Sequence, residues 1–214
     1  MDKDVRVAEY FPIPGPGELV YSGDGRILAC ANRTSAHLLE ENKDSFRVEH
    51  PRPKRSSVGA TTIVGIAFSP NNSQFATAGT DGLVCLWRTR DCAQMKQLAG
   101  HTAQVHSVAF SLDSSLLAST GADMTARIWH VASGRCIHSI RVPGRGMCVL
   151  FSPDNAILAV GCDKGELGLY DVRNDFAVLR SLHAHSASRG TQLRMAFGPL
   201  LPQKWGCPSE RRGV

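Results

Sequence analysis

A repeat of about 42 residues is the feature of this sequence that most constrains its fold. Four phenylalanines each follow an apolar pair and stand before Ser or Gly: Phe68, Phe110, Phe151 and Phe197. They are spaced by 110 − 68 = 42, 151 − 110 = 41 and 197 − 151 = 46 residues. A period of this length is typical of chains built from stacked supersecondary units. The sequence therefore predicts a succession of similar units.

Two further positions keep the same register within each unit. An alanine stands eight residues after each of the first three phenylalanines, and an aromatic residue stands nineteen after, which gives Ala76, Ala118, Ala159, Trp87, Trp129 and Tyr170. A fainter copy precedes them, because Ala29 follows Tyr21 by eight residues. We count four units and the start of a fifth.

Each unit is expected to contain four short strands. In the second clear unit these would span residues 105–111, 116–121, 126–131 and 135–142, which are ordinary strand lengths. Turn chemistry separates them, since the Pro70–Ser73 and Asp81–Gly82 segments suit tight turns. Several strands are apolar or small on both faces, as expected of sheets covered on both sides. The fold class is all-β, with the period of β-propeller blades.

The units resemble WD repeats over about residues 17–197. The clearest instance has Gly100-His101 nine residues before Phe110, then Asp123 in the turn after the second strand and Trp129 in the third. The resemblance implies that His101, Asp123 and Trp129 join a buried hydrogen-bonded network, together with a serine or threonine. A buried carboxylate needs such donors to offset the loss of water.

The other units depart from that pattern. Two residues before each turn aspartate, where the family places serine or threonine, the chain has Gly79, Gly121 and Gly161, so we expect an incomplete network.

Nine residues before Phe68 and Phe151 stand Gly59 and Val142. By this count the histidine is missing beside two residue pairs: Asp81 with Trp87, and Asp163 with Tyr170. Asp163 also lies one residue out of register.

The units suggest a division of the chain. We expect an N-terminal extension at 1–16 and propeller blades over 17–197, with blades at 17–50, 61–99, 100–142 and 143–182 and a partial blade at 183–197. A polar, proline-bearing linker is expected near 42–60. Residues 198–214 form a basic, Gly/Pro-rich tail outside the pattern. These features favour an incomplete ring and a partial or truncated member of the family, whose open blade edges would favour self-association.

Composition excludes several classes of protein. No apolar stretch is long enough to span a membrane. The seven cysteines are odd in number and never spaced Cys-x-x-Cys, so neither a disulfide framework nor a zinc site is indicated. The net charge of +5 is concentrated after residue 182, which leaves the repeats nearly neutral and makes nucleic acid an unfavoured ligand. We expect an intracellular, chiefly cytoplasmic protein, with the nucleus as an alternative.

Three sharper functions compete with a structural role. His101 with Asp123 could form a catalytic dyad, but the repeat already explains both residues. His183 and His185 could bind a metal, yet no third ligand is spaced nearby. The basic segment 52–55 resembles a short nuclear-import signal and fits an exposed linker equally well. We expect no catalytic residue, cofactor or metal.

The predicted function is a non-catalytic scaffold for protein–protein interaction, with proteins as partners. The alternatives are a regulator of a small GTPase, as some WD-type propellers are, and a non-functional truncated product. The resemblance implies a binding rim at the residues before each turn aspartate, namely Thr80, Ala122 and Cys162. These are small and uncharged, which disfavours a highly charged ligand there.

Overall fold

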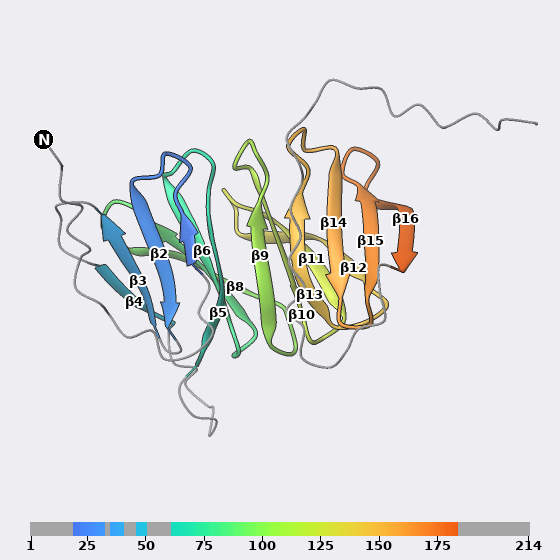
Figure 1. Ribbon diagram of the computed structural model, residues 1–214, viewed down its shortest axis with the longest axis horizontal. Coiled ribbons are helices and arrows are strands. Elements are labelled where there is room, and N and C mark those ends of the chain that lie inside the picture. The colour runs from blue at the N-terminus through green and yellow to red at the C-terminus, as the bar shows by residue number, and fades with distance from the viewer. Residues whose placement is uncertain (1–18, 33–34, 41–45, 51–60, 184–214) are drawn as a thin grey trace, which may run out of the picture.

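The computed structural model describes residues 19–32, 35–40, 46–50 and 61–183. Within these ranges the chain forms sixteen strands and no helix, gathered into four antiparallel sheets of four consecutive strands each (Figure 1). The strands are β1 (Leu19–Tyr21), β2 (Ile27–Asn32), β3 (Ser35–Glu40), β4 (Phe46–Glu49), β5 (Ile63–Phe68), β6 (Gln74–Gly79), β7 (Leu83–Arg88), β8 (Gln94–Ala99), β9 (Val105–Phe110), β10 (Leu116–Gly121), β11 (Thr125–His130), β12 (Arg135–Arg141), β13 (Gly146–Phe151), β14 (Ile157–Cys162), β15 (Glu166–Asp171) and β16 (Ala177–His183).

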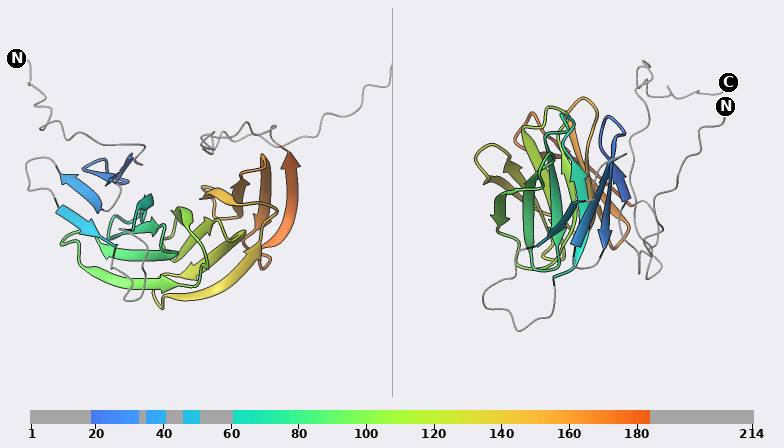
Figure 2. Two further views of the ribbon diagram at one scale, coloured as in Figure 1. Left: turned by 90° about the horizontal axis from the view of Figure 1, so that it is seen from below. Right: turned by 90° about the vertical axis from the view of Figure 1, so that its left-hand side faces the viewer.

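The four sheets stand side by side in an open arc (Figure 2). The first strand of each sheet lies on the concave side, where β9 contacts both β5 and β13. The all-β prediction and the incomplete ring of WD-type blades are thereby confirmed for the described residues. We call the sheets blades 1 to 4 in chain order. The expected fifth unit, the N-terminal extension and the C-terminal tail lie outside the described residues.

One predicted boundary needs correction. The segment 42–60 was expected to be a linker, yet β4 (Phe46–Glu49) lies within it and completes the sheet of blade 1. Val48 of this strand is buried, and so is His50, the residue that follows the end of the strand. The polar composition of 46–49 reflects an outer strand with one face in solvent, which is a pattern shared with β8, β12 and β16.

The blades are joined by two kinds of apolar surface. Each blade turns toward the next a cross-strand row of small or aliphatic side chains, such as Ala67, Ala76 and Leu86 in blade 2. The next blade meets it with a row of larger side chains: Phe110, Leu117 and Trp129 in blade 3. We call these the small row and the large row. Both rows lie in one buried cluster.

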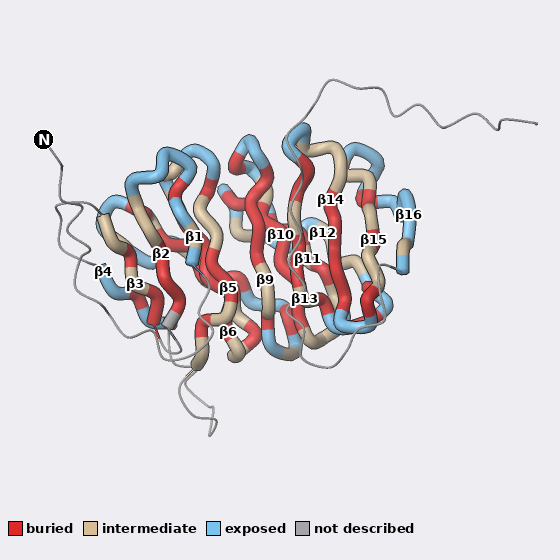
Figure 3. Tube along the Cα trace, in the orientation of Figure 1, coloured by how far each residue is buried: buried red, intermediate tan, exposed pale blue. Residues whose placement is uncertain are grey.

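The same pairing recurs at all three joints. Between blades 1 and 2, the small row is Val20, Ala29 and Leu38 and the large row is Phe68, Phe75 and Trp87. Between blades 3 and 4, the rows are Ala109, Ala118 and Ile128 against Phe151, Leu158 and Tyr170. The small side chains let the sheets approach, and the large ones fill the space between them. Figure 3 shows the resulting buried stretches along the inner strands and the exposed outer strand β16.

Turn-to-turn hydrogen bonds link the blades at one end of the strands. The N–H of Gly23 donates to Oδ1 of Asn72 in blade 2 at 2.8 Å, and the N–H of Leu112 donates to Oδ1 of Asn155 in blade 4 at 2.7 Å. Between them, the N–H of Asn71 donates to Oγ of Ser114 at 3.3 Å. Each acceptor residue has a positive φ, between 56° and 61°, which aims its side chain at the preceding blade. We call each of these bonds a turn clasp.

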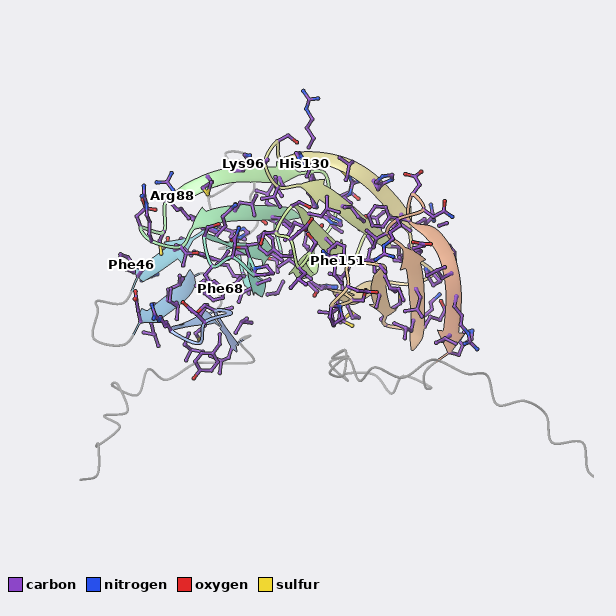
Figure 4. The ribbon with its side chains drawn as sticks, turned by 90° about the horizontal axis from the view of Figure 1, so that it is seen from above. Phe46, Phe68, Arg88, Lys96, His130 and Phe151 are labelled. Carbon is purple, nitrogen blue, oxygen red and sulfur yellow. The ribbon has the colours of Figure 1, made fainter. Side chains whose placement is uncertain are left out.

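A second link lies on the convex side of the arc. Lys96 on β8 donates from Nζ to the carbonyl oxygens of Val131 (3.0 Å) and Ala132 in the third turn of blade 3. At the matching register position on β12, the ring of His138 lies 3.1 Å from Asp175 Oδ1 and packs on Phe176 at 4.8 Å between centroids. Figure 4 shows Lys96 near His130 on the convex side and Phe151 toward the concave side.

Among the described residues, no helix is long and apolar enough to cross a membrane.

The turn clasps predict a specific stability difference at Asn155. Glycine there tolerates the positive φ but has no acceptor, so Asn155→Gly should lower the free energy of unfolding by about 1 kcal/mol. Asn155→Asp keeps an acceptor oxygen and should lose less. Urea unfolding of both variants checks this expectation, and equal losses would mean that the clasp contributes nothing.

Candidate functional site

Four side chains of blade 3 form a buried chain of hydrogen bonds. Trp129 Nε1 donates to Ser119 Oγ at 2.8 Å, and the same oxygen lies 2.8 Å from His101 Nε2. The other ring nitrogen of His101, Nδ1, lies 2.8 Å from Asp123 Oδ2. The side chain of His101 is 0% exposed and that of Asp123 is 4% exposed. The chain thus connects the segment before β9, the strands β10 and β11, and the turn between them.

The surroundings fix the protonation of this chain. Burial, the largest influence, lowers the pKa of His101 despite the nearby Asp123. Burial opposes ionisation of Asp123, yet hydrogen bonds from Thr125, His101 and the Thr102 N–H together hold its pKa below the usual value. At neutral pH the carboxylate is ionised and accepts from Nδ1–H. The neutral ring then accepts at Nε2 from the Ser119 hydroxyl, which itself accepts from Trp129.

Blade 2 holds a second complete network, against the prediction that its histidine is missing. His50 supplies the ring: Nε2 lies 2.6 Å from Thr77 Oγ1, and Nδ1 lies 3.3 Å from Asp81 Oδ2. Trp87 Nε1 donates to the same threonine oxygen at 2.8 Å. Burial opposes ionisation of Asp81, but bonds from His50 and the Leu83 N–H hold its pKa low.

In blades 2 and 3 the expectation of an incomplete network is wrong for a second reason. The hydroxyl lies four residues before the aspartate, at Thr77 and Ser119, and not two before it at Gly79 or Gly121. The sequence carried a usable signal, because Thr77 and Ser119 both stand nine residues after the repeat phenylalanine. His50 was missed because it precedes Phe68 by 68 − 50 = 18 residues, whereas His101 precedes Phe110 by 110 − 101 = 9.

Comparison with known proteins agrees with this geometry. The family model "WD domain, G-beta repeat" matches residues 52–88 and 92–130. These two stretches contain the turn aspartates and the tryptophans of both networks. The chain is a WD-repeat protein.

Several curated WD-repeat relatives are similar in sequence. THO complex subunit 3 of Arabidopsis thaliana is 26% identical over 140 residues, which cover 63% of this chain and 44% of that protein. Eukaryotic translation initiation factor 3 subunit I of Pyricularia oryzae is 27% identical, covering 58% and 38%. Coronin-7 of Bos taurus is 28% identical, covering 77% and 20%. The WD-repeat chain spans less than half the length of each of these relatives.

Blade 4 of the WD-repeat protein has an apolar substitute for the network. Val142 and Val160 occupy the histidine and hydroxyl positions, and both are buried beside Tyr170 in one apolar cluster. The strand register places Lys164, and not Asp163, at the turn-aspartate position, because Cys162 pairs with Gly146 as Gly121 pairs with Val105. Replacing all hydrogen-bonding partners together leaves no buried donor unpaired.

The same register corrects the predicted rim. Thr80 and Ala122 are half-buried residues in equivalent turns, where their N–H groups donate to Thr62 and Gln104 carbonyls. Cys162 is 1% exposed and lies in the strand. Its place is taken by Asp163, whose N–H donates to the Arg145 carbonyl and whose Oδ1 accepts the Arg145 N–H at 3.0 Å. The rim is therefore charged at blade 4.

No group of three metal-ligating side chains occurs in the described part of the chain. His183 Nε2 lies 3.9 Å from Glu166 Oε1, whereas His185 falls outside the described residues.

Replacing the turn aspartates should destabilise the fold. Asp123→Ala removes the carboxylate that accepts from the buried Nδ1–H of His101 at 2.8 Å and leaves only the longer contact of 3.3 Å to Thr125 Oγ1, which costs about 1–3 kcal/mol. Asp81→Ala should cost a similar amount through His50, while Lys164→Ala, at the same position of blade 4, should have little effect. Chemical and thermal unfolding of the three variants test this expectation. A melting temperature unchanged in Asp123→Ala would contradict it.

The lowered pKa of His101 predicts acid sensitivity. The unfolded state binds a proton near pH 6.5 and the folded state only at lower pH, so stability falls as pH drops below about 6.5. Asp123 and Asp81 add a loss in the same direction at more acidic pH, below about 4. His101→Gln should flatten the dependence of the free energy of unfolding between pH 7 and 5. His130→Gln, which removes an exposed imidazole, is the control, and an unchanged slope in His101→Gln would refute the assignment.

Proposed function

We propose that this WD-repeat protein is a non-catalytic scaffold that positions protein partners within a larger complex. One observation carries the proposal: the polar side chains that could perform chemistry, those of the His101 and His50 networks, are buried and hydrogen-bonded to one another. What remains accessible is a repeated frame with differing turns at its ends. Such a frame suits recognition of proteins through loops held on rigid strands.

The strongest competing interpretation is a hydrolase. Ser119, His101 and Asp123 have the hydrogen-bond order of a catalytic triad, with both links at 2.8 Å. A nucleophile, however, needs an approach for its substrate, whereas Ser119 is 0% exposed and its oxygen is held in the interior by the Trp129 N–H that it accepts. Blade 2 repeats the arrangement with Thr77. Two buried copies favour a role in holding the repeat together.

The rim is the surface we propose for partner binding. Thr80, Ala122 and Asp163 take equivalent places in successive blades, and the exposed Lys164 and Arg145 lie beside Asp163. The rim therefore changes from uncharged at blades 2 and 3 to mixed in charge at blade 4. This gradient fits a protein surface that is apolar at one end and charged at the other.

Relatives named as subunits of the THO complex and of eukaryotic translation initiation factor 3 support an intracellular scaffold. We propose the cytoplasm as its place of action, and no cofactor or metal as a requirement.

Rim substitutions test the scaffold. Thr80→Glu with Ala122→Glu should reduce at least tenfold the recovered amount of the proteins that co-purify and co-elute with the tagged chain. Gln97→Glu with Ser139→Glu adds the same charge to exposed positions of the outer strands β8 and β12 and should retain it. Equal recovery by both double variants would place the binding surface elsewhere, and recovery of one GTPase with accelerated nucleotide exchange would replace the scaffold by a regulator.

Chemical labelling tests the absence of catalysis. A fluorophosphonate probe, which reacts with activated serines, should leave Ser119 unlabelled in the folded chain because the hydroxyl is buried. Ser119→Ala serves as the matched control. Labelling that depends on Ser119 and is lost on unfolding would establish a reactive centre instead.

A further inference from the structure

Two apolar rows in the described arc have no partner blade. Blade 4 turns outward the small row Leu150, Ala159 and Leu169, which matches Ala109, Ala118 and Ile128 of blade 3 by register. Blade 1 turns outward the large row Tyr21, Leu28 and Leu39, which matches Phe68, Phe75 and Trp87. Tyr21 is 65% exposed, whereas its counterpart Phe110 is 8% exposed.

The two open rows are of opposite kinds. At all three internal joints the earlier blade in the chain supplies the small row and the next blade supplies the large row. The open small row at one end and the open large row at the other therefore belong to the same type of joint. They lie at the two opposite ends of the arc, on either side of its opening (Figure 2), so one molecule does not bring them together.

We propose that two copies of this chain close a ring head to tail, with blade 4 of each copy packed on blade 1 of the other. The four described blades of each copy make eight, within the range of closed propellers. Two-fold symmetry makes both new joints identical and covers the two open faces of the described blades in each copy.

The area of these joints is enough for a specific dimer. Strands of six residues run about 20 Å, and four of them lie about 4.8 Å apart, so a blade face covers on the order of 300 Å². Two joints with two faces each bury on the order of 1,200 Å², at the lower bound of stable interfaces.

One contact of the internal joints is absent from the new one. The turn clasp would run from the N–H of Asp154, which follows Pro153 as Asn71 follows Pro70, to residue 25 of the other copy. Gly25 stands where blades 2, 3 and 4 have Asn72, Ser114 and Asn155, and it shares their positive φ, at 70°. A Cβ at Gly25 would meet nothing within 4 Å. The dimer joint thus rests on apolar packing and should be weaker than the internal joints.

Analytical ultracentrifugation of the full chain tests the proposal. The wild type should sediment as a dimer that dissociates on dilution through the micromolar range. Gly25→Asn supplies the missing acceptor at both joints and should tighten the dimer about tenfold. Tyr21→Asp places a charge in the joint and should weaken it at least tenfold. Leu112→Asp, at a residue 57% exposed in a turn of blade 3, should leave the dissociation constant unchanged.

The gain expected from Gly25→Asn separates the proposal from a general loss of folding, because a damaged fold does not tighten a dimer. A wild-type monomer with cooperative melting at tens of micromolar would overturn the proposal. Larger, unbounded assemblies would also overturn it, as would a dimer whose dissociation constant is the same in Gly25→Asn and Tyr21→Asp as in the wild type. None of these results depends on whether the rim binds partners.

Discussion

Every blade of this protein depends on burial of apolar surface on both faces of its sheet. A four-stranded sheet in isolation exposes two faces, and neither can form a core with itself. At the three internal joints the small row and large row resolve this by giving each apposed face a complementary neighbour, so the core of the described arc consists of the joints between blades and not of any blade alone. Stability is therefore a property of neighbouring pairs of blades.

The buried hydrogen-bond networks hold segments together within a blade, in addition to the apolar packing between blades. The networks of His101 and His50 each tie the segment entering a blade to that blade's second and third strands. Blade 4 omits the network and places Val142, Val160 and Tyr170 in the same space. Both solutions leave few buried polar atoms unpaired, whereas a mixture of them would not. From blade to blade, the residues of the network are therefore kept together or replaced together.

The architecture was readable from the sequence because its cause is local and periodic. The spacing of Phe68, Phe110 and Phe151 reflects one supersecondary unit repeated along the chain, and the strands expected in blade 3 agree with those observed to within one residue. The polar network was harder to read because its members are defined by strand register. His50 shows this, because no count from Phe68 predicts it, whereas the count from Phe151 already places Lys164, and not Asp163, at the turn-aspartate position, in agreement with the strand register.

The position of His50 is fixed by its hydrogen bonds and not by its distance along the chain from the inner strand. The segment from His50 to Phe68 is twice as long as that from His101 to Phe110, yet both rings reach the same hydroxyl and carboxylate. The imidazole acts as an anchor before each inner strand, and the length of polypeptide between anchor and strand is released from geometric control. Such a connection is where a repeat protein can acquire new recognition sequence, or an inserted epitope, while the frame keeps its dimensions.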